Sequence, residues 1–227
     1  FLPALCRGEA IGAAAISEPG SRGDPARMSC RAERRDGEYE ITGTKEPVTN
    51  GPVADVFLVL ASTDPGAGKD GLSAFMVEKG EAVRAEELEL GFLPTSPHGR
   101  VVLEGVRVPV SNLLGEEGMG HDRVSRSIFV WERAVVIPAV LALLERLHHL
   151  VVSALDAASM APDARVLLAQ RKVELTAYGV LARRLLELAF AAQGESRERM
   201  ELLLFFGRAL PAWVESVRRF VEEDRLP

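Results

Sequence analysis

The spacing of apolar and polar positions changes near the middle of the chain. In the first half, short apolar runs alternate with turn residues about every 8–12 positions, which is typical of all-β structure. The clearest strand candidates are residues 56–62 and 72–78, and Asp36-Gly37 predicts a hairpin turn between two others. We expect about seven short strands in this half and no convincing helix.

The second half has helical periodicity and few helix breakers. We predict one helix over about 120–155 with an irregularity at Pro138, a second over about 163–192, and a third over about 197–224 that bends near Pro211. All three have wide apolar faces. We therefore expect them to pack on one another or on a partner.

These patterns predict an α+β architecture, with a small β-barrel domain over residues 1–118 and a helical domain over 119–227. The sequence opens on Phe1 within an apolar stretch rather than on a methionine. Three helices with such broad apolar faces also need further partners. We expect an N-terminal segment to be missing or to reside on a separate chain, and we expect homo-oligomers to form through the helices.

Composition and charge narrow the class of protein. The 227 residues carry a net charge of −6, which argues against binding to nucleic acid or to an anionic membrane surface. The longest apolar run, 135–144, is too short to span a bilayer. Cys6 and Cys30 cannot form a disulfide framework, and no charged-then-apolar leader opens the chain, so we expect a cytoplasmic protein.

Two polar segments of the first half are candidate ligand sites. The Gly-rich turn over 16–24 has main-chain N–H groups that can hold a phosphate or a ring carbonyl, and Thr49 offers a hydroxyl at the end of a strand. An ordinary surface turn is the commoner interpretation of each segment when it is considered alone.

Glu132 is the candidate for acid–base chemistry in the second half. Its sequence neighbours Phe129, Trp131 and Val135 are apolar, and an apolar pocket raises the pKa of a carboxyl toward that of a general base. Spacing alone favours a solvated side chain, as for most helix glutamates. His148-His149 diverge on a helix and no ligand spacing typical of metal sites occurs, so we expect no metal.

Five segments, taken in order over about 115 residues, resemble motifs of the acyl-CoA dehydrogenase family of flavoproteins. Ala15-Ile16-Ser17-Glu18-Pro19-Gly20 with Asp24 resembles the family's TEPGAGSD loop, and Gly43-Thr44-Lys45 with Val48-Thr49-Asn50 resembles GTKxWITN. The other three segments are 54–59, 72–79, and 106–109 with 112–115.

The resemblance implies a layout and a cofactor. The chain matches the family's middle β-barrel domain and a shortened C-terminal helical domain, without the N-terminal helical domain. In the family, FAD lies between the β domain and the C-terminal helices. The positions that match its FAD-binding residues are Ile16, Ser17, Gly23, Val48 and Thr49.

The resemblance also implies an activity, the α,β-dehydrogenation of an acyl thioester of CoA or of a carrier protein. Glu132 matches the base that removes the α-proton in one branch of the family, while the β-hydride passes to the flavin. Arg133 would then lie near the thioester or its phosphopantetheine arm, and Asp24 matches a substrate-binding position.

Several positions depart from the family pattern. Arg22-Gly23 stands where the family has Gly-Ser, Pro47 stands where it has Trp, and residues 160–163 occupy the region of its RxQFG motif. A non-catalytic member that serves assembly or acyl-carrier binding is therefore the alternative. Trp131-Glu132-Arg133 and the segment 95–99 most resemble members from polyketide and peptide natural-product pathways.

Overall fold

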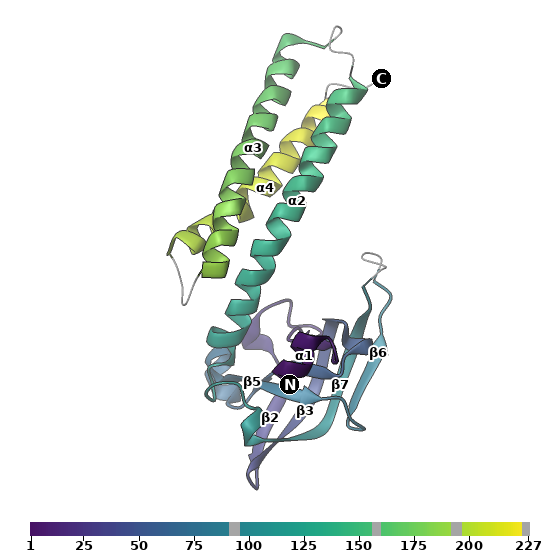
Figure 1. The fold of residues 1–227 in the computed structure, drawn as a ribbon, viewed down its shortest axis with the longest axis vertical. Helices are drawn as coiled ribbons and strands as arrows, with labels where there is room; N and C mark the ends of the chain where they lie inside the picture. The colour runs from purple at the N-terminus through teal and green to yellow at the C-terminus, as the bar shows by residue number, and fades with distance from the viewer. Residues whose placement is uncertain (91–95, 156–159, 192–196, 224–227) are drawn as a thin grey trace. The chain divides into compact units, whose positions relative to one another are not determined.

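The computed structural model divides into two compact units, Phe1–Ser127 and Ile128–Pro227, which we call the β unit and the helical unit (Figure 1). The structure describes residues 1–90, 96–155, 160–191 and 197–223.

The β unit is built on one curled sheet of seven strands (Figure 1). The strands are β1 (Gly12–Ala15), β2 (Arg31–Arg35), β3 (Glu38–Thr49), β4 (Val56–Ser62), β5 (Leu72–Glu78), β6 (Val83–Glu87) and β7 (His98–Pro109). Their order is β1-β4-β2-β3-β7-β6, and β5 pairs with β4. The expected number of strands is confirmed. Within the described residues β1 does not pair with β6, so the β-barrel-like domain that we expected is an open half-barrel.

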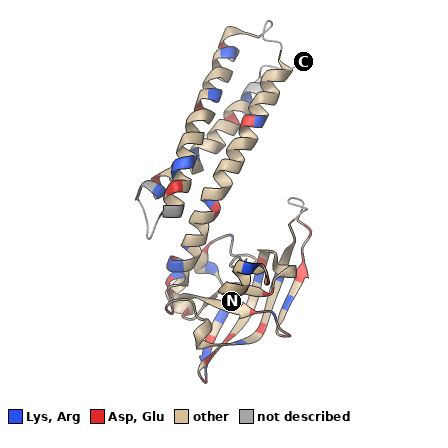
Figure 2. Cartoon of the chain, in the orientation of Figure 1, with Lys and Arg blue, Asp and Glu red and all other residues tan. Residues whose placement is uncertain are grey.

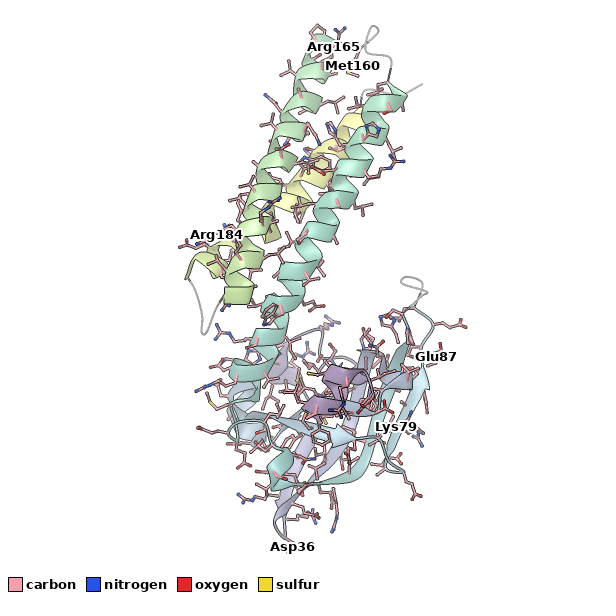
Figure 3. All side chains as sticks on the ribbon, in the orientation of Figure 1. Asp36, Lys79, Glu87, Met160, Arg165 and Arg184 are labelled. Carbon is pink, nitrogen blue, oxygen red and sulfur yellow. The ribbon has the colours of Figure 1, made fainter. Side chains whose placement is uncertain are left out.

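The two long strands β3 and β7 run antiparallel and form the centre of this sheet. β3 also pairs with β2 across the hairpin turn, where Asp36 and Gly37 have φ of 50° and 85°. Positive φ at both central residues is what a type I′ turn requires, and this confirms the predicted hairpin. Asp36 lies at the tip of the hairpin (Figure 3).

A short helix, α1 (Leu2–Arg7), contradicts the expectation of no helix in the first half. Pro3 lies in its first turn, and Gly8 ends it with φ of 70°, a left-handed conformation that glycine adopts without strain. Six residues are too few to show a helical period, so the apolar pattern gave no signal.

The core of the β unit is apolar and lies on the inner face of the sheet. The rings of Tyr39 and Phe75 meet with centroids 4.9 Å apart. The other fully buried apolar residues at its centre include Ile41, Val48, Phe57, Val59, Val77 and Val101. Burial of each large apolar side chain contributes on the order of 1.5–3 kcal/mol, so this layer holds the strands in register.

The helical unit contains three long helices, α2 (Arg126–Ala154), α3 (Pro162–Ala191) and α4 (Arg197–Glu223). These bounds confirm the three predicted helices, except that the first begins with a π-helical turn, Gly120–Ser125. Pro138 and Pro211 both lie inside helices. The helices share one buried apolar cluster, which includes Ala134, Ile137 and Leu141 of α2, Leu175 and Leu185 of α3, and Phe206 and Trp213 of α4.

The stretch Gly120–Ala154 spans 35 residues and is long and apolar enough to cross a membrane by length and composition. The expectation drawn from the run 135–144 considered only uninterrupted apolar residues, and so did not take in the helix as a whole. Figure 2 shows how few charged residues lie along α2. Its inward face, which includes Ala134, Ile137 and Leu144, packs in the core of the helical unit. A place in a helix bundle explains that part of its apolar character.

Candidate functional site

The segment that follows β1 lies against β3, so the structure brings together two of the motifs singled out in the sequence. The carbonyl of Ile16 accepts a hydrogen bond from Nζ of Lys45 at 3.0 Å. The carbonyl of Ser17 accepts one from the main-chain N–H of Glu46 at 2.8 Å. Because these residues are almost 30 positions apart in sequence, only the fold makes them neighbours.

Glu18 is the centre of this contact. Its Oε1 lies 2.8 Å from Nζ of Lys45, and both side chains are almost completely buried. The N–H and hydroxyl of Ser29 donate to its Oε2 at 2.6 and 2.9 Å, and the N–H of Cys30 donates to Oε1 at 3.1 Å. Both carboxylate oxygens are therefore satisfied, as a buried charge requires.

The electrostatics of this buried group follow from its partners. Burial acts to raise the pKa of Glu18, but the charge of Lys45 and the hydrogen bonds from Lys45 and Ser29 outweigh it and leave the pKa below its ordinary value. Burial raises the pKa of the neighbouring Cys30 thiol to about 11. The carboxyl is thus ionised and the thiol protonated near neutral pH.

Gly43, the first residue of the Gly43-Thr44-Lys45 motif, lets β3 approach the start of β2. A Cβ at this position would lie 2.7 Å from both Cα and Cβ of Cys30 and 2.8 Å from its Sγ. Only glycine fits such a close approach. This glycine therefore supports the segment whose N–H groups bind Glu18.

We call the buried Glu18–Lys45 pair and the segments that it joins the frame of the site. The serine and threonine expected to bind a ligand lie at the surface of this frame. Ser17 and Thr49 are both exposed, and within the described part of the chain neither hydroxyl has a hydrogen-bond partner. Ile16 is half-buried, whereas Val48 is completely buried in the core. The structure thus brings Ile16 and Ser17 to β3, the strand that ends at Thr49.

The loop after Glu18 contains two more of the expected site residues. Gly23 has φ of 76°, and Arg22, at a position where the family pattern has a small residue, has φ of 55°. The carboxylate of Asp24 accepts a hydrogen bond from the N–H of Ala26 at 3.0 Å and so caps a short helical turn, Pro25–Arg27. Gly23 and Asp24 are both exposed.

Glu132 and Arg133 lie on α2 in the helical unit, and both are exposed there. The guanidinium of Arg133 lies 4.7 Å from the ring centroid of Phe129, within cation–π distance. Phe129 and Arg133 line a pocket of about 420 Å³ between α2 and α4, together with Ile137 and Leu203. The apolar neighbours of Glu132 in sequence do not enclose it within this unit.

Sequence reasoning missed the central role of Glu18 and Lys45. Both residues were quoted in the motifs, but neither was assigned a function. The available signal was the presence of one acidic and one basic residue, Glu18 and Lys45, within the two motifs. Ser29 and Cys30, which complete the hydrogen bonds to Glu18, belong to no motif and gave no signal.

Comparison with known proteins finds relatives of this chain. Residues 13–106 match the family model "Acyl-CoA dehydrogenase, middle domain". L-prolyl-[peptidyl-carrier protein] dehydrogenase of Pseudomonas fluorescens is 40% identical over 148 residues, which cover 64% of this chain and 39% of that protein. Mitochondrial isovaleryl-CoA dehydrogenase of Oryza sativa subsp. japonica is 44% identical over 122 residues, which cover 53% of this chain and 30% of that protein.

Solved structures match both units of the chain. A glutaryl-coenzyme A dehydrogenase complexed with glutaryl-CoA has a TM-score of 0.78 and 26% identity, and the match covers 98% of this chain and 58% of that one. The prolyl acyl carrier protein oxidase AnaB has a TM-score of 0.67 and 27% identity, with 95% and 57% covered. This chain therefore spans less than two thirds of each of these proteins.

The half-barrel and the helices form an acyl-CoA dehydrogenase-like fold. Residues 13–106 match the acyl-CoA dehydrogenase middle-domain model, and this match confirms the resemblance drawn from the five motifs.

Proposed function

We propose that the protein containing this chain is an FAD-dependent dehydrogenase of acyl thioesters. The observation that carries the proposal is the pair of exposed, unpartnered hydroxyls of Ser17 and Thr49, presented by segments that the Glu18–Lys45 contact holds together. They lie within the region that matches the dehydrogenase middle domain.

The chemistry of these groups fits the polar edge of a flavin ring. Ser17 and Thr49 would donate hydrogen bonds to it, Ile16 would offer an apolar surface, and Gly23 would let the main chain approach closely. Val48 is buried, so its role would be to fix the end of β3. Bound FAD would supply the acceptor for the β-hydride.

Glu132 is the proposed base for the α-proton of the thioester. This proton is weakly acidic, so the reaction needs a carboxylate shielded from water and a thioester whose carbonyl is polarised. Glu132 is exposed in the helical unit, and the proposal therefore requires that substrate or other protein segments cover it. Arg133 would bind near the thioester or its phosphopantetheine arm, with Asp24 as a second substrate contact.

The proposed substrate is an acyl group on CoA or on a carrier protein. A carrier-protein dehydrogenase and an acyl-CoA dehydrogenase are both among the relatives, and the carrier-protein enzyme matches a longer stretch, 148 residues against 122. This favours the natural-product branch and a tethered substrate.

We also propose a cytoplasmic homo-oligomer that forms through the helices and is completed by an N-terminal helical segment or chain. Large apolar side chains remain exposed on all three helices within the described part of the chain, among them Val135, Leu143, Val173, Val180 and Leu204.

A non-catalytic member of the family is the second candidate. The exposure of Glu132 favours it, because a solvated carboxylate is a weak base for a thioester α-proton. In this role the fold would serve assembly or acyl-carrier binding and would not need bound flavin.

Flavin absorbance near ~450 nm in the purified full protein separates the two candidates, because the dehydrogenase carries a redox cofactor.

In the dehydrogenase, Glu132→Gln should slow flavin reduction by substrate about 10²–10⁴-fold, the scale of a lost general base, without changing flavin content. Glu145→Gln, an exposed glutamate on the same helix, is the matched control. Unaltered flavin reduction in Glu132→Gln would refute the assignment. Acyl-CoA and acyl-carrier substrates should be assayed side by side.

A further inference from the structure

We propose that the buried Lys45–Glu18 ion pair is a positioning device that sets the spacing between Ser17 and Thr49 and thereby the affinity for FAD. The inference rests on the proposed function, since it assigns these hydroxyls to the flavin. It assigns a role to two residues that touch neither substrate nor cofactor in that proposal.

Lys45 contacts both residues that flank Ser17, namely the main chain of Ile16 and the side chain of Glu18. Its Nζ binds the carbonyl of Ile16 at 3.0 Å and Oε1 of Glu18 at 2.8 Å. The N–H of Glu46 binds the carbonyl of Ser17 itself at 2.8 Å. Three consecutive residues are thus each tied to β3, and Ser17 is the middle one.

The ladder between β3 and β7 does not supply this constraint. Lys45 pairs with Val101 and Val48 pairs with Gly99, but the register shifts between these two pairs. Beyond this irregularity Val48 and Thr49 pair again with Gly99 and His98, so the ladder fixes Thr49 but not the segment that carries Ser17. Contacts from Lys45 and Glu46 fix the segment 16–18 at this irregular point.

Burial explains why the ion pair holds the segment 16–18 against β3 in a single arrangement. The side chains of Lys45 and Glu18 are 0% and 2% exposed. A buried pair contributes little net stability compared with apolar residues of similar volume, but it tolerates few alternative arrangements. The remaining donors to Glu18 are the N–H of Ser29, which binds Oε2, and the N–H of Cys30, which binds Oε1, and they hold the carboxylate in place. The pair therefore fixes a distance more than it stabilises the core.

The test uses the double variant Glu18→Gln/Lys45→Met in the full protein, which removes both charges and nearly keeps the side-chain volumes. We expect it to remain folded by circular dichroism, to bind FAD at least about 10-fold more weakly in a fluorescence titration, and to alter the shape of the bound flavin absorbance band. The matched control, Arg84→Met/Glu104→Gln, removes an exposed ion pair of the same unit and should bind FAD like the parent.

Hydrogen exchange gives a readout that needs no flavin. The amide of Glu46 should exchange at least about 10-fold faster in the double variant, while amides shared by β4 and β5 keep the parent rate. Parent-like FAD affinity together with parent-like Glu46 exchange would overturn the positioning role. A parent protein that binds no FAD would instead overturn the proposed function, and the flavin role of the pair with it, even if Glu46 exchange rises. If the double variant does not fold, Glu18→Asp takes its place, because it keeps the negative charge and shortens the side chain. Parent-like FAD affinity of Glu18→Asp would likewise overturn the inference.

Discussion

Gly43→Ala tests whether the close approach of β3 to Cys30 holds the frame of the candidate site. The added Cβ would meet Cα and Cβ of Cys30 at 2.7 Å, well inside the ordinary contact distance of about 3.5–4.0 Å. Neither atom belongs to a flexible side-chain end, so the strands themselves must move apart. Overpacking of this kind costs about 1–3 kcal/mol.

A second cost follows from the hydrogen bonds next to the clash. The N–H of Cys30 donates to the buried carboxylate of Glu18, and moving Cys30 weakens this bond. A hydrogen bond to a charged group contributes about 1.5–3 kcal/mol, of which a displaced strand loses a part. We expect Gly43→Ala to lower the free energy of unfolding by about 2–4 kcal/mol in total.

Urea unfolding followed by circular dichroism measures this loss. With a slope of about 2 kcal/mol per molar urea, the midpoint should fall by roughly 1–2 M. The control is Gly80→Ala, because a Cβ at Gly80 meets no atom within 4 Å. A Gly43→Ala midpoint equal to that of the Gly80→Ala control would show that the approach of β3 to Cys30 is not as tight as described.

Three further predictions follow from buried groups. The pKa of Glu18 is lowered in the folded protein. Its contribution to stability is therefore fully present above the unfolded pKa of about 4.3 and is lost as pH falls through the lower folded pKa. Acid unfolding of Glu18→Gln should show a weaker pH dependence in that window. Phe206→Ala should lower the free energy of unfolding by about 3–5 kcal/mol because the ring is buried in the helical core, whereas Leu204→Ala, at an exposed position, should change it far less in the same thermal melt. A thiol reagent at neutral pH should label the exposed Cys6 at once and Cys30 only after unfolding, because Cys30 is buried with a pKa of about 11; labelling of both at equal rates by mass spectrometry would contradict this.

The sequence predicted those elements whose signals are local. Residues 56–62 and 72–78 form strands with the predicted bounds, because each is an apolar run that ends at turn residues. The hairpin at Asp36-Gly37 carries its own turn chemistry. The three long helices also followed from their period, since each repeats its apolar face over many turns.

Features that depend on distant contacts were not predictable in the same way. The open edges of the sheet depend on which strands pair, and strand composition does not state the partner. Glu18 and Lys45 are 27 residues apart, so their ion pair exists only once β1 and β3 are placed. The exposure of Glu132 depends on what packs on α2, and the apolar neighbours of Glu132 in sequence do not determine that.

The site divides into a buried frame and an exposed surface, and two of the departures from the family pattern lie on that surface. Glu18, Lys45 and Val48 match the family motifs and are buried. Arg22 and Pro47, which replace family residues, are exposed. A sequence that was losing its fold would also lose the frame, since an unpaired Glu18 or Lys45 would be strongly destabilising. The retained frame with changed surface residues therefore fits our proposal that the site serves an acyl group on a carrier protein.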